Sequence, residues 1–173
     1  MYPSRQYGFV LITSIMFMLV LTLVVVYAVR SATIYERVAG NNRNYSQAFQ
    51  AAEFALQQAR GKLVDIPTIS STNSCNDGMC GKDTDISTFN NPDNWTMSGN
   101  LAKSCKVSDS CNTAGASKAI TFPGSTSEHQ PRYIIKELSI SGSCAFYEIT
   151  AFGKGGNASS SSILRSVVKA CDS

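Results

Sequence analysis

The sequence has few of the residues on which catalysis usually depends. It contains a single histidine, His129, which lies in a polar stretch between Ser125 and Pro131 with no nucleophile motif around any serine. No Gly-rich phosphate loop, GxSxG motif or HExxH motif occurs. Nucleophilic catalysis needs a base held close to a serine or cysteine, and nothing here favours one. We therefore expect no enzymatic activity and no cofactor.

Basic residues are also few and scattered. The chain has 15 basic and 12 acidic side chains, which gives a net charge of +3. Nucleic-acid binding is typically indicated by basic runs or by basic residues interleaved with aromatic ones, and neither pattern occurs. We therefore expect no nucleic-acid partner.

The sequence lacks the spacing of a metal site. No CxxC pair accompanies the single histidine, which disfavours zinc. The aspartates that could bind calcium match no EF-hand spacing and are better interpreted as solvated turn residues; they are Asp77, Asp83, Asp85 and Asp93. We therefore expect no metal.

Six cysteines occur, an even number, and all follow the apolar segment described below. They are Cys75, Cys80, Cys105, Cys111, Cys144 and Cys171. An even set of this kind is typical of disulfide bonds in a chain that folds in the periplasm or outside the cell. Six thiols allow fifteen pairings, and proximity along the sequence favours Cys75–Cys80 and Cys105–Cys111.

One stretch has no charge at all. No charged side chain occurs between Arg5 and Arg30, and residues 9–29 are apolar except for Thr13, Ser14 and Thr22. A helix of about 21 residues crosses roughly 30 Å of hydrocarbon. The three hydroxyls can bond to carbonyls one turn earlier, so they are tolerated in lipid. We expect a single membrane helix over residues 9–29.

The apolar run is too long for a cleaved secretory signal, whose core has roughly 7–15 residues. An uncleaved signal anchor fits the length equally well. Charge bias does not settle its orientation, because Arg5 lies on one side and Arg30, Arg37 and Arg43 lie on the other.

The junction RQYGFVLI, residues 5–12, resembles a prepilin peptidase site. It has a short basic leader, Gly8 at the last leader position and Phe9 opening the apolar helix. The resemblance implies that residues 1–8 are a leader, that cleavage follows Gly8, and that Phe9 is N-methylated.

The continuation resembles PilX-type minor pilins of type IV pili, in RSATIYERVAGN at residues 30–41 and QAFQAAEFAL at residues 47–56. The likeness covers about residues 5–63. The fifth mature position, normally Glu in major pilins, is Thr13, a departure that PilX-type proteins often share. In the family this Glu is thought to pair with the N-terminal amine of a neighbouring subunit.

The resemblance implies a structural subunit that moves from the inner membrane, as a single-pass protein, into an extracellular type IV pilus. Its expected position is at or near the tip, with roles in assembly initiation, adhesion, aggregation or twitching motility. The expected partners are other minor pilins, the major pilin, prepilin peptidase, the inner-membrane assembly machinery, a tip adhesin and, before assembly, membrane lipid. Two alternatives stay open: a type II secretion pseudopilin, whose K-type component is usually much larger, and a membrane-anchored periplasmic binding module that is never polymerised.

Residues 30–63 are expected to continue the helix with an amphipathic character. The apolar stripe comprises Ile34, Val38, Tyr45, Ala48, Phe49, Ala52, Leu56, Ala59 and Leu63. Residues 40–42, Gly-Asn-Asn, are a weak point, because glycine costs about 1 kcal/mol relative to alanine inside a helix. The helix is expected either to bend or melt there or to pass straight through. Gly61 and Pro67 are expected to end it.

Residues 64–117 are expected to form a variable, cysteine-containing connection with a short helix or strand or an exposed functional surface. Residues 118–173 are expected to form an antiparallel sheet with a C-terminal disulfide loop, from strands at 118–122, 132–141, 144–154 and 162–170. Even spacing predicts that one strand buries Ile134, Leu138 and Ile140, and that the next buries Ala145, Tyr147, Ile149 and Ala151. A Cys144–Cys171 pair would resemble the C-terminal loop of many pilins. The predicted fold is α+β and pilin-like, a long N-terminal helix packed on this sheet with disulfide-tied loops.

Overall fold

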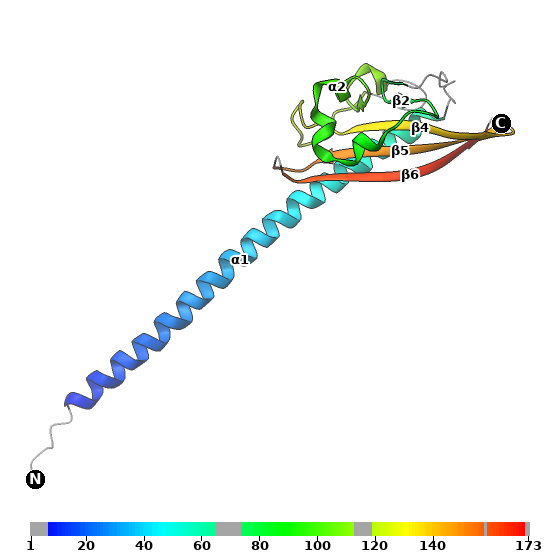
Figure 1. Ribbon diagram of the computed structural model, residues 1–173. Coiled ribbons are helices and arrows are strands. Elements are labelled where there is room, and N and C mark those ends of the chain that lie inside the picture. The colour runs from blue at the N-terminus through cyan, green and yellow to red at the C-terminus, as the bar shows by residue number, and fades with distance from the viewer. Residues whose placement is uncertain (1–6, 65–73, 113–118, 158, 172–173) are drawn as a thin grey trace, which may run out of the picture. The chain divides into compact units, whose positions relative to one another are not determined.

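The computed structural model describes residues 7–64, 74–112, 119–157 and 159–171 (Figure 1). It divides into two compact units, Met1–Asn42 and Arg43–Ser173. The expected leader residues 1–6 and the expected helix stop at Pro67 lie outside the described residues.

Helix α1, Tyr7–Lys62, runs through the apolar segment. In the first unit every large apolar side chain from Phe9 to Val29 is exposed, and α1 is long and apolar enough to cross a membrane. Its hydroxyls bond within the helix, Ser14 to the Leu11 carbonyl at 2.9 Å and Thr22 to the Leu19 carbonyl at 2.8 Å. Their polar groups are therefore satisfied without water, as a helix in lipid requires.

The second unit is built on a six-stranded sheet in the order β1-β2-β4-β5-β6, with β3 also paired to β4. The strands are β1 (Cys75–Asn76), β2 (Met79–Cys80), β3 (Cys105–Lys106), β4 (Arg132–Ser141), β5 (Cys144–Lys154) and β6 (Ser161–Cys171). The pilin-like α+β fold is confirmed. Strands β4, β5 and β6 pair antiparallel, as expected for residues 118–173. The short strand β2, whose place in the sheet was not expected, lies parallel to β4 and makes the whole sheet mixed.

The strand expected at 118–122 does not form in the described residues 119–122. The backbone N–H of Phe122 donates to the side-chain amide of Gln130 at 2.6 Å, and that of Ile120 donates to the Val107 carbonyl at 3.0 Å. These two backbone N–H groups therefore donate to a side chain and to a loop carbonyl, and not to a neighbouring strand.

One face of the sheet packs against the second-unit part of α1. The contact consists mainly of alanines that are 0% exposed, namely Ala48, Ala51, Ala52, Ala55 and Ala59. Ala55 and Ala59 form one core with Leu56, Leu63 and the expected inward residues of β5. The expected stripe is wrong at its N-terminal end, where Tyr45 and Phe49 are 59% and 48% exposed and Ile34 and Val38 are exposed as well.

The opposite face is covered by the segment between β2 and β3 (Figure 1). It folds into η1 (Ser87–Asn90), η2 (Pro92–Thr96) and α2 (Ser98–Leu101). Trp95 stacks on Phe152 of β5 with ring centroids 5.3 Å apart, and its indole N–H donates to the Phe89 carbonyl at 2.9 Å. The expected variable connection thus supplies a second small core with Ile134.

Of the residues that spacing predicts to be buried in β4, Ile134 is buried, Leu138 is half-buried and Ile140 is exposed. Tyr133 and Ile135 lie in the core with α1, and Ile134 lies in the core with Trp95, so burial is two-sided. The β4–β5 register shifts between Glu137 and Ser139, and Ile140 is 67% exposed. A bulge moves the following residues to the other face, which even spacing alone does not reveal.

The structure pairs Cys75 with Cys80, Cys105 with Cys111, and Cys144 with Cys171. The last pair joins the ends of β5 and β6 across 27 residues of sequence. Closing a loop of that length should stabilise the unit by about 3 kcal/mol in the chain-entropy model.

We expect all six cysteines to be oxidised in the native protein. Alkylation under denaturing, non-reducing conditions should modify none of them, and alkylation after reduction should modify all six. A Cys144→Ala/Cys171→Ala variant should lose about 3 kcal/mol of unfolding free energy. Labelled thiols before reduction would contradict the pairing.

Candidate functional site: the apolar helix and a disulfide-tied surface

The start of α1 carries the residues expected to act in processing and assembly. Gly8 and Phe9 lie in its first turns, and the Phe9 side chain is 73% exposed. The Thr13 hydroxyl lies 3.1 Å from the Phe9 carbonyl and 3.0 Å from the Val10 carbonyl, so it bonds within its own helix. Thr13 therefore presents neither a carboxylate nor an unpaired donor to a neighbouring chain.

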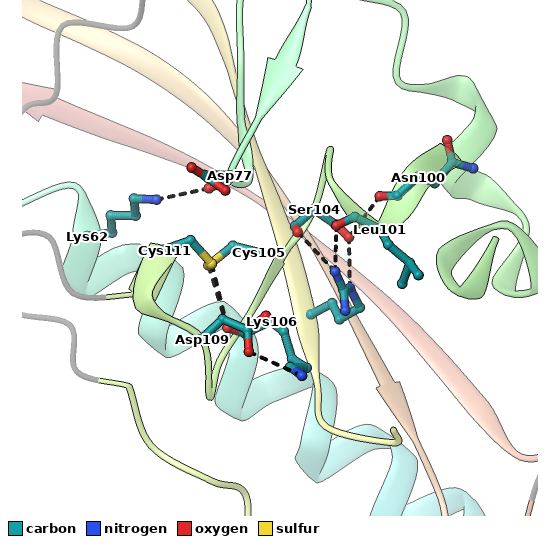
Figure 2. Close-up of a disulfide and its surroundings, with 10 residues drawn as sticks. Lys62, Asp77, Asn100, Leu101, Ser104, Cys105, Lys106, Asp109 and Cys111 are labelled. Carbon is teal, nitrogen blue, oxygen red and sulfur yellow. Dashed lines mark hydrogen bonds and ion pairs between the residues drawn. A yellow bond between two sulfur atoms is a disulfide. The ribbon is translucent and has the colours of Figure 1, made fainter. Parts of the chain in front are cut away.

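In the second unit, the disulfide-tied segments meet near the end of α1 (Figure 2). The Lys62 ammonium donates to the Asp77 carbonyl at 3.1 Å and lies 5.9 Å from the centroid of the Tyr133 ring. Lys62 is only 5% exposed. Burial lowers the pKa of Lys62, an effect that the Asp77 carboxylate partly offsets, and burial raises the pKa of Tyr133. Lys62 thus links the β1–β2 turn to the helix.

That turn is held close to β3. Asp77 and Gly78 both have positive φ, 48° and 80°. A Cβ added at Gly78 would lie 2.6 Å from the Cys105 Cβ. Glycine is needed there both for the left-handed backbone and for the close approach. The two short disulfide loops, Cys75–Cys80 and Cys105–Cys111, are therefore in contact at this point.

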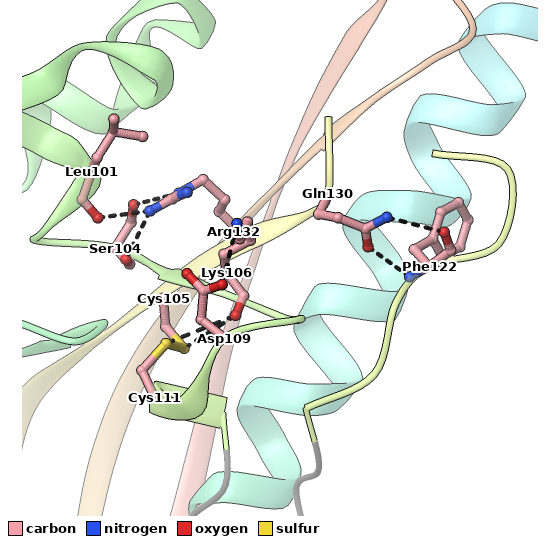
Figure 3. A network of polar contacts seen from close by, with 9 residues as sticks. All are labelled: Leu101, Ser104, Cys105, Lys106, Asp109, Cys111, Phe122, Gln130 and Arg132. Atoms are coloured by element: carbon pink, nitrogen blue, oxygen red, sulfur yellow. Dashed lines mark hydrogen bonds and ion pairs between the residues drawn. A yellow bond between two sulfur atoms is a disulfide. The ribbon is translucent and has the colours of Figure 1, made fainter. Parts of the chain in front are cut away.

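Arg132 and Gln130 fix the irregular segments on either side of β4 (Figure 3). The Arg132 guanidinium donates to the Ser104 hydroxyl at 2.8 Å and to the Leu101 and Ser104 carbonyls at 2.6 and 3.1 Å. Burial lowers the pKa of Arg132, and the nearby Asp109 carboxylate opposes that shift. Besides accepting from the Phe122 N–H, Gln130 donates to the Phe122 and Ser125 carbonyls at 3.3 and 3.0 Å. Both side chains hold backbone groups in place.

A polar cavity of about 470 Å³ lies between these segments. It is lined by Asp77, Leu101, Ala102, Ser104, Ser108, Asp109, Ser110 and Cys111. Its Asp109 carboxylate forms an ion pair with Lys106 at 3.1 Å. Within the described ranges, no three His, Cys, Asp or Glu side chains are grouped to hold a metal ion. The cavity offers hydrogen bonds and local charge, without an arrangement suited to a metal.

Two of the aspartates considered for calcium, Asp85 and Asp93, make local contacts within their own turns. Asp85 accepts from the Ser87 N–H at 2.8 Å and from the Ser87 hydroxyl at 2.9 Å, and these bonds lower its pKa. The Asp93 N–H donates to Asn91 at the start of η2. Both are turn and capping contacts.

The sequence alone did not indicate the roles of Lys62, Gln130 and Arg132. Lys62 stands at the end of an amphipathic helix, where a lysine is normally solvated. Gln130 and Arg132 flank Pro131, and no local pattern predicts that they bind distant carbonyls. Their roles depend on tertiary contacts.

Comparison with known proteins identifies the N-terminal part. Residues 8–57 match the family model described as PilX N-terminal. This part of the chain is therefore similar to the N-terminal region of PilX-type proteins. The match ends before the first disulfide, and no curated protein or solved structure matches the chain. This match confirms the resemblance noted in the sequence, and together with the apolar helix it fits a membrane-anchored pilus subunit.

The burial of Lys62 predicts a pH dependence. The pKa of Lys62 is lower in the folded chain than its ordinary value of 10.5 in the unfolded chain. Below pH 10.5 the unfolded chain therefore binds more protons at Lys62 than the folded chain does, and this penalty on folding is relieved as the pH rises. In Lys62→Met this contribution is absent. The unfolding free energy of the native protein minus that of Lys62→Met should therefore rise from pH 8 to pH 10.

Urea unfolding of both proteins at each pH is the measurement. Tyr133, whose raised pKa gives the opposite trend above its ordinary value of 10.0, is present in both proteins and largely cancels in the difference. A difference that does not change with pH would contradict the burial of a charged Lys62. At neutral pH, Met should be tolerated within about 1.5 kcal/mol, because replacing a buried charge by an apolar side chain of similar volume is often neutral or better.

Proposed function

We propose that this chain is a structural minor pilin that is incorporated into a type IV pilus at or near its tip and helps to initiate assembly. The match of residues 8–57 to the PilX N-terminal family model is the observation that carries the proposal. The charge-free, exposed helix from Phe9 to Val29 supports it, because such a surface is stable only in lipid or against other apolar helices. The disulfide-tied sheet unit suits exposure outside the cell.

The tip position is argued from Thr13. Burying an N-terminal amine without a partner costs several kcal/mol, and a Glu at the fifth mature position is expected to supply that partner for the subunit above. Thr13 offers only a hydroxyl that is already bonded within its helix. Its own Phe9 amine can still pair with the Glu of the next subunit. The chain is therefore least penalised where no subunit lies above it.

Immunogold labelling of intact pili tests the position. We expect label confined to pilus ends and few pili in a deletion strain. Label spread evenly along the shaft would contradict the tip position, while absence of the chain from sheared, purified pili would contradict incorporation itself.

The mass of the mature N-terminus separates the alternatives. A chain that begins with methylated Phe9 is processed as a pilin, whereas a retained Met1 would favour a membrane-anchored binding module. A processed chain that co-purifies with a type II secretion complex and is absent from pili would favour a pseudopilin.

A further inference from the structure

The segment of α1 around residues 40–42 separates two parts of the helix with different support. The two compact units meet after Asn42. Gly40, Asn41 and Asn42 are exposed, and a Cβ added at Gly40 would meet nothing within 4 Å. No side-chain hydrogen bond or ion pair is present at these three residues in the part of the chain that the structure describes. Only the helical backbone holds this turn.

The helix gains backbone support immediately after this turn. A Cβ added at Gly155 would lie 2.2 Å from the Asn44 carbonyl oxygen, and one added at Gly153 would lie 2.3 Å from the Ala48 carbonyl oxygen. The end of β5 and the residue after it thus pack directly against the α1 backbone from Asn44 onward. Opening the helix beyond Asn44 would break this packing, whereas opening it at residues 40–42 would not.

We propose that residues 40–42 are a joint in α1, a turn that is helical in the folded protein and opens locally more often than the helix on either side. Glycine is the poorest helix former after proline, and asparagine is among the weaker ones. The preceding residues, Val38 and Ala39, are better helix formers than glycine. The turn that follows is packed against the end of β5 and Gly155. The weakest intrinsic propensity therefore coincides with the absence of tertiary support.

The role of the joint rests on the proposed function. A pilin leaves a bilayer and enters a fibre, and the apolar helix and the sheet unit then meet different neighbours. A joint at residues 40–42 lets the apolar helix and the sheet unit change orientation to fit their new neighbours without breaking the α1–β5 contact.

Hydrogen exchange on the full-length protein in detergent tests the joint directly. Peptides covering residues 31–38, 39–45 and 46–56 are compared, and the middle one should exchange fastest. Gly40→Ala/Asn41→Ala/Asn42→Ala should slow its exchange roughly 30-fold, the equivalent of about 2 kcal/mol of helix propensity. The matched control, Ser46→Ala/Gln50→Ala/Gln57→Ala, changes three exposed positions of the supported helix and should leave the middle peptide unchanged.

Two results would overturn the joint. Exchange at residues 31–38 as fast as at 39–45 would indicate general fraying, and an alanine variant no slower than the control would exclude the composition of the turn as the cause. In cells, the alanine variant should make fewer pili than the control variant. Normal piliation with slowed exchange would overturn the role in assembly, whereas absence of the native chain from pili would refute the minor-pilin function and leave the exchange result standing.

Discussion

Gly153→Val should strongly destabilise the packing of the sheet on α1. Gly153 lies near the end of β5, and a Cβ there would approach the Ala48 carbonyl oxygen and the Ala52 nitrogen to 2.3 Å each. These are backbone atoms of a helix, so they cannot move aside as a flexible side chain could. Overpacking commonly costs 1–3 kcal/mol, and a branched side chain against backbone should reach at least about 3 kcal/mol. Total stabilities are only about 5–15 kcal/mol.

The single tryptophan provides the measurement. Trp95 is fully buried against Phe152, the residue before Gly153, so its fluorescence reports on this part of the core. Urea unfolding of the full-length protein in detergent should show a much lower midpoint, or no transition, for Gly153→Val. The control is Gly99→Ala, because Gly99 lies in α2 without a positive φ and its Cβ would meet nothing within 4 Å. An unchanged midpoint for Gly153→Val would show that β5 does not approach the helix this closely.

The same contact explains why the helix stripe could be predicted only in part. The spacing of Ala48, Ala52, Leu56 and Leu63 located the buried side of α1 correctly. It could not indicate that the contact is too close for larger residues. Phe49 is therefore exposed although it lies on the expected stripe, and Ala51 and Ala55 are buried although they were not assigned to it. Hydrophobicity alone ranks Phe49 above Ala51, whereas the glycine on the facing strand decides the outcome.

The sheet shows the same division between local and long-range information. Period-two alternation located β4, β5 and β6 and the inward face of β5, because these depend on neighbouring residues. The parallel pairing of β2 with β4 and the second core around Trp95 join residues more than 50 positions apart, as in Met79 with Ile135 and Trp95 with Phe152. No periodicity within a short segment carries that information.

The candidate site divides in a similar way. The apolar helix could be predicted because a missing charge and a long apolar run are local features with a direct physical meaning in lipid, whereas processing at Gly8 and Phe9 stays a prediction. The contacts of Lys62 and Arg132 could not, since each binds a carbonyl far away in sequence, Asp77 and Leu101 respectively. Long cationic side chains are usually solvated, and only the fold reveals that Lys62 is buried and Arg132 is half-buried.

Gly8→Leu should block maturation completely. The peptidase is expected to cut between Gly8 and Phe9, where the last leader residue must have almost no side chain to pass close to the enzyme. Leucine is as apolar as the helix that follows, so membrane insertion should be unaffected and cleavage alone should fail. We expect only the full-length chain, starting at Met1, in the inner membrane, and none in pili.

Intact-mass measurement of the membrane fraction and of sheared pili provides the readout. Gln6→Leu is the matched control, because it adds the same side chain to the leader and keeps Gly8, and it should be processed normally. Gly8→Ala, with one added methyl group, should retain partial processing, which would relate the block to side-chain size. Normal cleavage of Gly8→Leu would contradict the processing site and, with it, the assignment of Phe9 as the mature N-terminus from which the role of Thr13 is argued.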